Sequence, residues 1–316
     1  NNQNKENVLN SQKHLFHCGI MNISNKPENE ATPPAGAADT SVRVVRSHPV
    51  NMHVPAIELV SLTKCFGNSV EPAVKSVDLS VAQGEVLAIV GGSGSGKTTT
   101  LKMINRLIEP TSGSVKVMGE DVTNVDPVGL RRSIGYAFQG VGLFPHMSVG
   151  QNVGVTLQLL GWTKDSIIEQ VNELLTMVDL PADEYRDRLP SELSGGQQQR
   201  VGFARALASK PQAILMDEPF GALDPITRDA LQQEFRSLQK KLELSVVLVT
   251  HDMSEAVLLA DRIAVMHKGE IAQVASPQVL LTSPVNAYVA QLIDTPRRHS
   301  DFIESLLHGK ASGGAR

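Results

Sequence analysis

A glycine-rich segment between a buried strand and a helix constrains this sequence more than any other feature. An apolar, β-branched run at residues 85–90 predicts a buried strand, and residues 99–104 predict a helix. The segment between them has the pattern GxxxxGK[ST] and consists of Gly91, Gly92, Ser93, Gly94, Ser95, Gly96, Lys97 and Thr98. Glycines let successive backbone N–H groups turn inward as an anion nest, and the helix N-terminus adds partial positive charge. The sequence therefore predicts a phosphate-binding loop in an α/β domain.

The residues that close this loop supply the groups that a nucleoside triphosphate requires. We expect Lys97 to reach the β- and γ-phosphates of ATP, and the hydroxyl of Thr98 to bind Mg²⁺. Thr99 follows in the first helical turn and is included among the nucleotide-binding residues. A merely flexible Gly/Ser loop is the alternative, but the complete pattern directly after a strand disfavours it.

A second apolar strand, at residues 213–218, ends in two adjacent carboxylates, Asp217 and Glu218. Side chains alternate along a strand, so the two carboxylates should point in different directions. We expect Asp217 to hold Mg²⁺, directly or through water, and Glu218 to polarise the attacking water. An acidic pair at a strand end is often only part of a turn. Its position after a phosphate-binding loop favours the catalytic interpretation.

A second glycine pair begins another helix, in the run Ser194, Gly195, Gly196 and Gln197. The spacing of Ser194 and Gln197 is that of a capping box, which by itself would be purely structural. Two glycines in a first helical turn cost about 1 kcal/mol each relative to alanine, which suggests that an anion approaches their N–H groups. The chain already has its own phosphate loop. We therefore interpret the second segment as a lid over the nucleotide of a partner chain.

These segments resemble the motifs of the ATP-binding cassette (ABC) ATPases. Residues 193–197, with the sequence LSGGQ, match the signature motif of that family. Gln139, after a predicted strand at 134–138, resembles the Q-loop glutamine. His251, after the strand at 245–250, resembles the switch histidine that senses the γ-phosphate.

Two further elements complete the resemblance. Residues 221–224 resemble the D-loop, with Gly221 where serine is commoner, and Asp224 is its nucleotide-facing residue. Phe66 stands where the family places an aromatic side chain that stacks on adenine. The resemblance implies that Gln139 joins Thr98 and Asp217 as a third Mg²⁺ ligand.

The resemblance also implies the fold and the mechanism. The expected fold is a P-loop NTPase ABC domain with an antiparallel β subdomain and a helical insertion. Glu218, His251 and Gln139 would act in catalysis, with ATP and Mg²⁺ bound between two chains arranged head to tail. The signature of one chain would close on the phosphate loop of the other. Because this chain has one copy of each motif, the expected assembly contains a second ATP-binding subunit, identical in the simplest case.

Composition changes along the chain suggest three regions. Residues 1–55 are Asn-rich and then Pro/Ala/Gly-rich, so we expect a disordered or non-native leader. Residues 56–275 are assigned to the ABC domain, with the helical subdomain at about 140–210. Residues 276–316 are expected to form a short C-terminal helical tail.

A stretch from residue 133 to residue 163 contains no Asp, Glu, Lys or Arg. It includes a predicted helix that begins at Ser148, and a second predicted helix follows at 163–178. The inward face of the first helix is predicted to comprise Val149, Val153, Leu157 and Leu160. That of the second helix is predicted to comprise Ile167, Ile168, Val171, Leu174, Leu175 and Val178. No run of about 18 apolar residues exists here, so the stretch is no membrane span. Around Phe144 it is either plain core or the docking surface for a membrane subunit, and the docking interpretation is favoured.

Net charge and cysteine content argue against a nucleic-acid-binding protein and against a disulfide-stabilised one. A net charge of −4 without a basic cluster argues against a nucleic-acid partner. Two cysteines provide no disulfide framework.

The absence of fused membrane helices and of a long coiled coil favours a separate ATP-binding subunit of an importer. Residues 101–113 and 142–146 resemble the quaternary-amine branch of these importers, which transports glycine betaine, choline, carnitine and proline. Importers of amino acids, polyamines or phosphonates are the alternative, and a non-transport ABC ATPase is the alternative of another class. The implied partners are integral-membrane permeases and, indirectly, an extracellular or periplasmic solute-binding protein. The implied location is the cytoplasmic face of the cell membrane, as a peripheral subunit.

Overall fold

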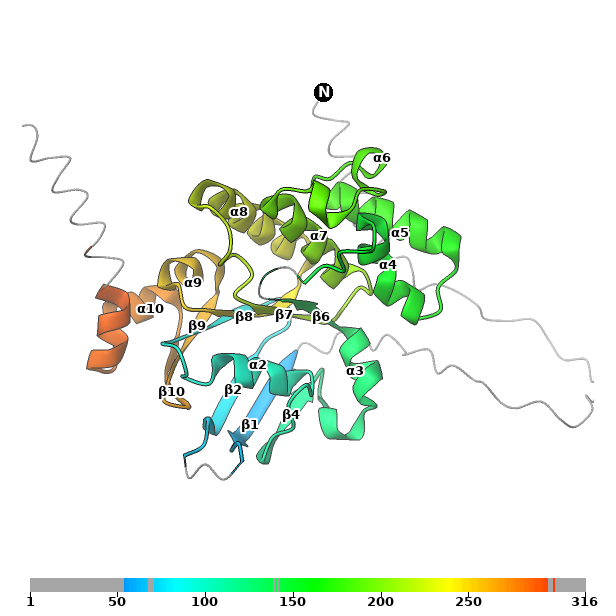
Figure 1. Cartoon of the computed structure of the whole chain (residues 1–316). Coiled ribbons are helices and arrows are strands. Elements are labelled where there is room, and N and C mark those ends of the chain that lie inside the picture. Colours follow the sequence, from blue (N-terminus) through cyan, green and yellow to red (C-terminus); the bar gives the residue numbers. More distant parts are fainter. Residues whose placement is uncertain (1–53, 68–70, 139, 141, 295–297, 299–316) are drawn as a thin grey trace, which may run out of the picture. The chain divides into compact units, whose positions relative to one another are not determined.

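The computed structural model describes residues 54–67, 71–138, 140, 142–294 and 298 (Figure 1). The expected leader therefore falls almost entirely outside the described residues. Among the described residues, no helix combines the length and hydropathy that a membrane crossing requires.

A six-stranded sheet carries the nucleotide-binding segments. Its strands are β3 (Val86–Val90), β6 (Ile134–Ala137), β7 (Ala213–Asp217), β8 (Ser245–Thr250), β9 (Arg262–His267) and β10 (Glu270–Ala275). The spatial order is β10-β9-β3-β8-β7-β6, and every neighbouring pair is parallel except the antiparallel pair β9 and β10. Because β3, β8 and β7 are adjacent and parallel, the loops after their carboxyl ends meet at one edge of the sheet.

The alternating side chains of the central strands pack into two separate hydrophobic cores. In β3, residues 86, 88 and 90 pack on one side of the sheet, whereas Leu87 and Ile89 pack on the other. All five residues of this strand are buried. This arrangement explains why the strand has a continuous apolar sequence, as expected for a parallel strand covered on both faces.

A four-stranded antiparallel sheet packs on one of these faces, as predicted for the β subdomain. It comprises β1 (Ile57–Lys64), β2 (Val74–Val81), β4 (Ser112–Val117) and β5 (Glu120–Asp121), in the order β2-β1-β4-β5. Helix α2 (Lys97–Ile104) follows the glycine loop and lies between the two sheets (Figure 1). Leu101, Met103 and Ile104 of α2 are fully buried in the core that joins them.

Helices cover the opposite face of the large sheet (Figure 1). They are α4 (Val149–Leu159), α5 (Lys164–Met177), α6 (Ala182–Tyr185), α7 (Gly195–Leu207), α8 (Pro225–Leu242) and α9 (Met253–Leu259). Short helices α3 (Pro127–Ser133) and α10 (Pro277–Thr282) and the 3-10 turns η1 (Val122–Asn124) and η2 (Pro190–Glu192) connect the larger elements. Residues 287–294 are also helical.

The predicted helical faces are confirmed with two exceptions. Ser148 caps α4 through a capping box with Gln151, and Val149, Val153 and Leu157 are completely buried. Leu160 was predicted to face inward but is 40% exposed, because α4 ends at Leu159 and the chain turns there. Ile168 is 48% exposed, since it lies about 100° around the helix from Ile167, which packs on the core.

Candidate active site

The glycine loop is pressed against neighbouring backbone, which explains why glycine is required at two of its positions. Gly96 has φ +104°, and a Cβ atom there would lie 2.5 Å from the carbonyl oxygen of Ala73. A Cβ atom on Gly91 would collide with the carbonyl oxygen of Met266 in β9. The loop therefore follows a path that side chains at these positions would prevent. Ser93 and Gly94 lie exposed at its tip, while Ser95 is buried.

Lys97 is held inside this loop. Its Nζ donates to the carbonyl oxygens of Gly91 and Gly92, at 2.9 Å each. The side chain is buried, and desolvation lowers the pKa of the ammonium, partly opposed by the charges of Glu218 and Asp217. A buried ammonium surrounded mainly by neutral carbonyls is a favourable place for an incoming phosphate.

Thr98 and Asp217 meet at the edge of the sheet, from the first turn of α2 and the end of β7. The Thr98 hydroxyl donates to Asp217 Oδ1 at 3.0 Å. Burial raises the pKa of the Asp217 carboxyl, and the Thr98 hydrogen bond opposes that rise. A hydroxyl and a carboxylate this close are oxygen donors of the kind that Mg²⁺ takes, so these residues fit the predicted ion. Thr99 lies half-buried in the same helical turn.

Glu218 directly follows the end of β7 and has a different partner from Asp217, namely His251. Its backbone has φ +47°, an uncommon value for a side-chain-bearing residue, and its N–H donates to the carbonyl of Val249 in β8 at 2.9 Å. This turn brings Glu218 Oε2 to 3.2 Å from Nδ1 of His251. The His251 side chain is 66% exposed, so the pair lies open to solvent on one side. Strained backbone of this kind is common at functional sites.

The second glycine segment forms the capping box that its spacing predicts. The Ser194 hydroxyl accepts from the N–H of Gln197 at 3.3 Å, and the Gln197 side chain accepts from the N–H of Ser194 at 2.9 Å. The two glycines have different environments. A Cβ atom on Gly196 would lie 2.6 Å from Thr227 of α8, so packing alone requires glycine there. Gly195 is exposed, and a Cβ atom there would have its nearest neighbour at 3.7 Å. Of these two glycines, Gly195 is therefore the one that packing does not require.

Two other predicted residues lie on exposed loops. Asp224 is the N-cap of α8 and accepts from the N–H of Thr227 at 3.0 Å, which lowers the pKa of its carboxyl. Phe66 is 47% exposed on the connection between β1 and β2, with Lys64 Nζ 5.2 Å from its ring centroid. The other end of that connection, Ala73, lies against Gly96 of the glycine loop.

Gln139 lies outside the described residues, but the segment that follows it is informative. Phe144 is 41% exposed, so the plain-core interpretation of the charge-free stretch is wrong at this residue. Arg205 of α7 is buried beneath it, with its guanidinium carbon 5.9 Å from the Phe144 ring and 5.8 Å from that of Phe138. Arg205 also donates to the carbonyl of Gly142 at 2.8 Å. An exposed aromatic patch thus rests on a buried cation.

Sequence motifs missed one residue that contacts the site and one that contacts the neighbour of a site residue. Tyr288, in the C-terminal helical segment, accepts a hydrogen bond through its hydroxyl from the N–H of Gly92 at 2.9 Å. That N–H therefore does not belong to the inward-facing set that the sequence predicts. Glu255 of α9 accepts a hydrogen bond from Thr250, next to His251. Neither residue belongs to a pattern quoted above, so only the fold could reveal them.

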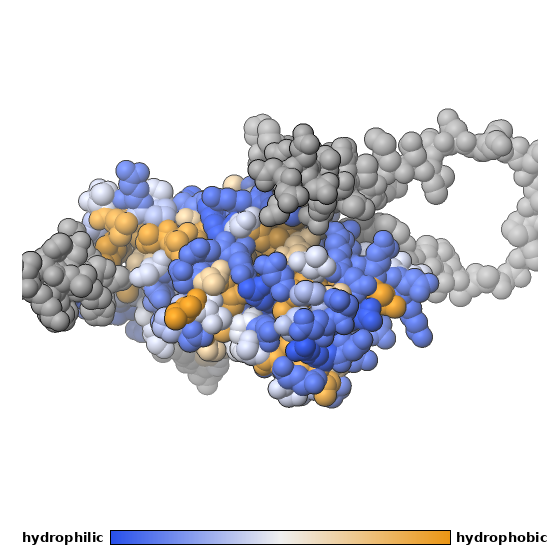
Figure 2. Space-filling view, turned by 90° about the horizontal axis from the view of Figure 1, so that it is seen from above, coloured by the Kyte–Doolittle hydropathy of each residue, from blue (hydrophilic) through white to orange (hydrophobic). Residues whose placement is uncertain are grey.

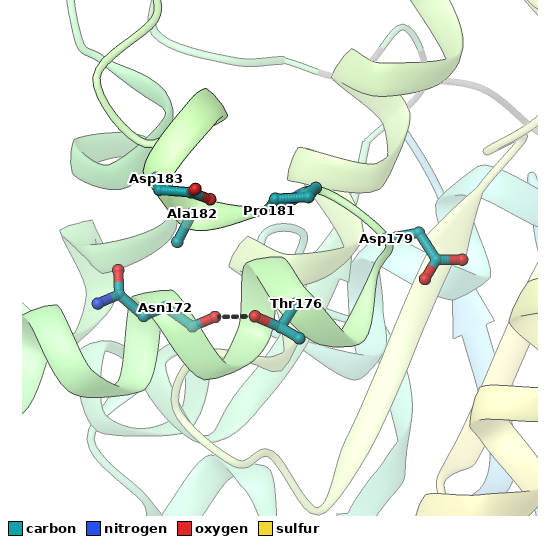
Figure 3. A pocket seen from close by; sticks show the side chains of 6 residues that line it. All are labelled: Asn172, Thr176, Asp179, Pro181, Ala182 and Asp183. Atoms are coloured by element: carbon teal, nitrogen blue, oxygen red, sulfur yellow. Dashed lines mark hydrogen bonds between the residues drawn. The ribbon is translucent and has the colours of Figure 1, made fainter. Parts of the chain in front are cut away.

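A separate hollow of about 430 Å³ lies in the helical region (Figure 3). It is lined by Asn172, Thr176, Asp179, Pro181, Ala182 and Asp183. None of these residues is one of the predicted site residues. The Asp179 side chain is directed away from Asn172 in this view and approaches Arg200 at 3.7 Å. The hollow is therefore distinct from the edge of the sheet where Lys97, Asp217 and Glu218 meet.

Comparison with known proteins agrees with this geometry. A family profile described as "ABC transporter" matches residues 74–221. The chain is 48% identical to the glycine betaine uptake system ATP-binding protein YehX of Escherichia coli, over 74% of this chain and 75% of that protein. This chain belongs to the ABC transporter family. It thus has the ABC ATPase fold that the motifs predict.

Two further similarities extend the comparison. The chain is 55% identical to the glycine betaine/carnitine/choline transport ATP-binding protein OpuCA of Bacillus subtilis, over 76% of this chain. It spans only 63% of the length of OpuCA, which is less than two thirds. A solved structure of the ATP-binding cassette MJ0796, a dimer in a post-hydrolysis state with ADP and Pi, is 34% identical with a TM-score of 0.63. It aligns with 70% of this chain and 98% of that one.

Proposed function

We propose that this chain is the ATP-hydrolysing subunit of an importer for glycine betaine, choline and related osmoprotectants. The observation that carries the ATPase proposal is the convergence of two pairs at adjacent strand ends. Thr98 lies 3.0 Å from Asp217, and Glu218 lies 3.2 Å from His251. The first pair suits a phosphate-bound cation, and the second suits a water held for attack.

In this proposal each residue has a distinct task. Lys97 has three ammonium N–H donors, so it binds the β- and γ-phosphates while the loop carbonyls hold it in place, and the loop amides hold the same phosphates. Glu218 polarises the attacking water, while His251 orients the Glu218 carboxylate and contacts the γ-phosphate. Phe66 stacks on the adenine.

Thr98 and Asp217 would hold Mg²⁺, with Gln139 as the third proposed ligand. The ion, when bound, neutralises charge on the phosphates. The Thr98 hydroxyl would offer its lone pairs to the ion in place of its hydrogen bond to Asp217. Burial of Asp217 keeps its carboxylate poorly hydrated, which favours exchange of a hydrogen bond for an ion contact.

Hydrolysis in this proposal needs two chains, because the lid segment Ser194–Gln197 serves the nucleotide of the partner. The first amides of a helix have no partner within the helix. In α7 the N–H of Gln197 donates to the Ser194 hydroxyl, so the N–H groups of Gly195 and Gly196 are the ones proposed to meet an incoming phosphate. Gly195 is exposed and has room around it, so Gly195→Asp should fold while placing a negative charge where the phosphate would arrive. Lys97→Ala disables the other half of the shared site, which is formed by the glycine loop.

A mixing experiment tests the shared site. Each variant alone should hydrolyse ATP at a background rate. In an equimolar mixture, half of the dimers are mixed, and each mixed dimer contains one intact site of two. The mixture should therefore recover up to about a quarter of the unmodified rate, as head-to-tail pairing requires. Full activity of Gly195→Asp alone, or no recovery on mixing, would contradict the shared site.

A permease is the proposed membrane partner, and the exposed patch of Phe138 and Phe144 is its proposed docking surface. Both rings are more than 40% exposed, and the stretch around them carries no charge. The face of the molecule seen from above is mostly hydrophilic, with apolar residues in separate patches (Figure 2). Docking at a permease would place the chain at the cytoplasmic face of the membrane, with a solute-binding protein on the other side.

The substrate proposal rests on the relatives, two of which carry names that refer to glycine betaine. The test is to identify the permease and the solute-binding protein encoded beside this chain and to titrate that binding protein. Glycine betaine, choline and carnitine should bind, whereas spermidine, amino acids and phosphonates should not. Binding of one of the latter alone would refute the osmoprotectant assignment and leave the ATPase proposal intact.

A further inference from the structure

The outer side of the glycine loop is held by segments that follow β9 in the chain. The N–H of Gly92 donates to the hydroxyl of Tyr288 at 2.9 Å. The N–H of Gly269, in the turn between β9 and β10, donates to the carbonyl of Ser95 at 3.0 Å. The loop thus has hydrogen bonds at two of its residues, Gly92 and Ser95, to the part of the chain that follows β9.

Tyr288 is itself placed by a packed element. Its ring lies against that of His267 with centroids 3.7 Å apart and planes inclined by 35°. The next residue, Val289, is completely buried, and Ile293 is 5% exposed. Both belong to the same core as alternate residues of β3, the strand that leads into the loop. The position of the hydroxyl is therefore set by ring contact and by core packing.

One peptide unit of the loop is bonded from both sides. The carbonyl of Gly91 and the N–H of Gly92 belong to the same planar peptide, in which they point in opposite directions. Lys97 Nζ binds that carbonyl at 2.9 Å on the inner side, while Tyr288 accepts from that N–H on the outer side. Rotation of this peptide would break both hydrogen bonds. Tyr288 therefore fixes the orientation of a carbonyl that holds the lysine.

We propose that Tyr288 is a positioning residue of the nucleotide site, which orients the Gly91–Gly92 peptide and through it Lys97. The inference rests on the proposed nucleotide binding. Without the Tyr288 hydroxyl, the peptide is free to rotate and the loop must be ordered when a nucleotide arrives. That ordering lowers affinity for the nucleotide without removing any group that contacts it.

Tyr288→Phe tests this role, since it removes the hydroxyl and keeps the ring against His267. The dissociation constant for ATP is measured with the full chain in EDTA by fluorescent-nucleotide titration, so that hydrolysis does not intervene. We expect it to rise about three- to tenfold, the range for one hydrogen bond. In ATPase assays the KM for ATP should rise while kcat at saturation is retained. The melting temperature of the nucleotide-free chain should hardly change.

A matched control removes a different tyrosine hydroxyl. Tyr185 accepts from the side chain of Gln197 at 3.1 Å and not from the glycine loop. Tyr185→Phe should leave the ATP dissociation constant in EDTA unchanged. The inference would be overturned if Tyr288→Phe bound ATP as tightly as the unmodified chain. It would also be overturned if both tyrosine variants showed the same loss of ATP affinity. Failure of the unmodified chain to bind ATP would instead overturn the proposed function, and with it this inference.

Discussion

The carboxyl group of Glu255 should make the stability of this chain depend on pH in a way that one substitution removes. Glu255 is 6% exposed, with one carboxyl oxygen bonded to Thr250 and the other, Oε1, buried without a hydrogen-bond partner among the described residues. Burial raises the pKa of this carboxyl to about 7, with a smaller contribution from Asp252 and opposing ones from Thr250, Arg228 and His251.

The sign follows from proton linkage. The folded chain binds the Glu255 proton more tightly than the unfolded chain does, so folding is favoured where the group is protonated. This contribution is complete below the ordinary pKa of glutamate and is lost as pH rises through 7. With pKa values of 4.5 unfolded and about 7 folded, the free energy of unfolding falls by about 2.5 kcal/mol between pH 5 and pH 8.

Glu255→Gln replaces the carboxyl with a neutral group of the same shape. Urea unfolding at several pH values from 5 to 8, without nucleotide, gives the free energy of unfolding for each protein. Between pH 5 and pH 8 the stability of the variant relative to the unmodified protein should increase by about 2.5 kcal/mol. Glu169→Gln, an exposed position on α5, should follow the unmodified protein. Parallel curves for the unmodified protein and Glu255→Gln would refute the buried-carboxyl argument.

Substitutions at three further residues test the proposed function. Glu218→Gln should bind ATP with unchanged affinity but hydrolyse it about 10²- to 10⁴-fold more slowly, the loss typical of a general base, as measured by phosphate release. Phe66→Ala should weaken ATP binding about tenfold, since stacking on a base contributes about 1–3 kcal/mol, whereas Phe66→Tyr should bind ATP as the unmodified chain does. Equal ATP affinities of Phe66→Ala and the unmodified chain would exclude a stacking role. Phe144→Glu should abolish transport in a reconstituted complex yet keep the ATPase rate of the isolated chain, and loss of both together would argue against a docking surface.

Sequence patterns were sufficient for the elements that carry the site. The strand before Gly91, the strand that contains Asp217 and the helix that begins after Ser148 all occur where apolar runs and helical periodicity predict them. Each has a local cause that a sequence displays: continuous apolar residues for a doubly covered strand, and the capping box of Ser148 and Gln151 for α4. These causes act over a few residues and need no knowledge of the fold.

Patterns failed where the cause lies far along the chain. The requirement for glycine at position 196 comes from Thr227 of α8, and its interpretation as an anion contact could not be separated from packing by sequence alone. The contact of Tyr288 with Gly92 joins residues 196 positions apart, and Tyr288 lies in a tail without a motif. Ile168 was misplaced for a simpler reason, since a helix with adjacent isoleucines does not indicate which of the two faces inward.

The hydrogen bonds of Lys97 explain how a buried lysine is maintained in a loop that is proposed to bind phosphate. Lys97 is desolvated, which destabilises its charge, and the carbonyls of Gly91 and Gly92 compensate only in part because they are neutral. Phosphate would add charged acceptors beside these neutral ones, and charge-assisted hydrogen bonds are roughly twice as strong as neutral ones. The free-energy cost of burying the ammonium is thus already included in the stability of the fold. Most of the free energy of the stronger hydrogen bonds can therefore contribute to phosphate affinity. This holds only if the carbonyls keep their orientation until the phosphate arrives, which is the condition that the hydroxyl of Tyr288 satisfies.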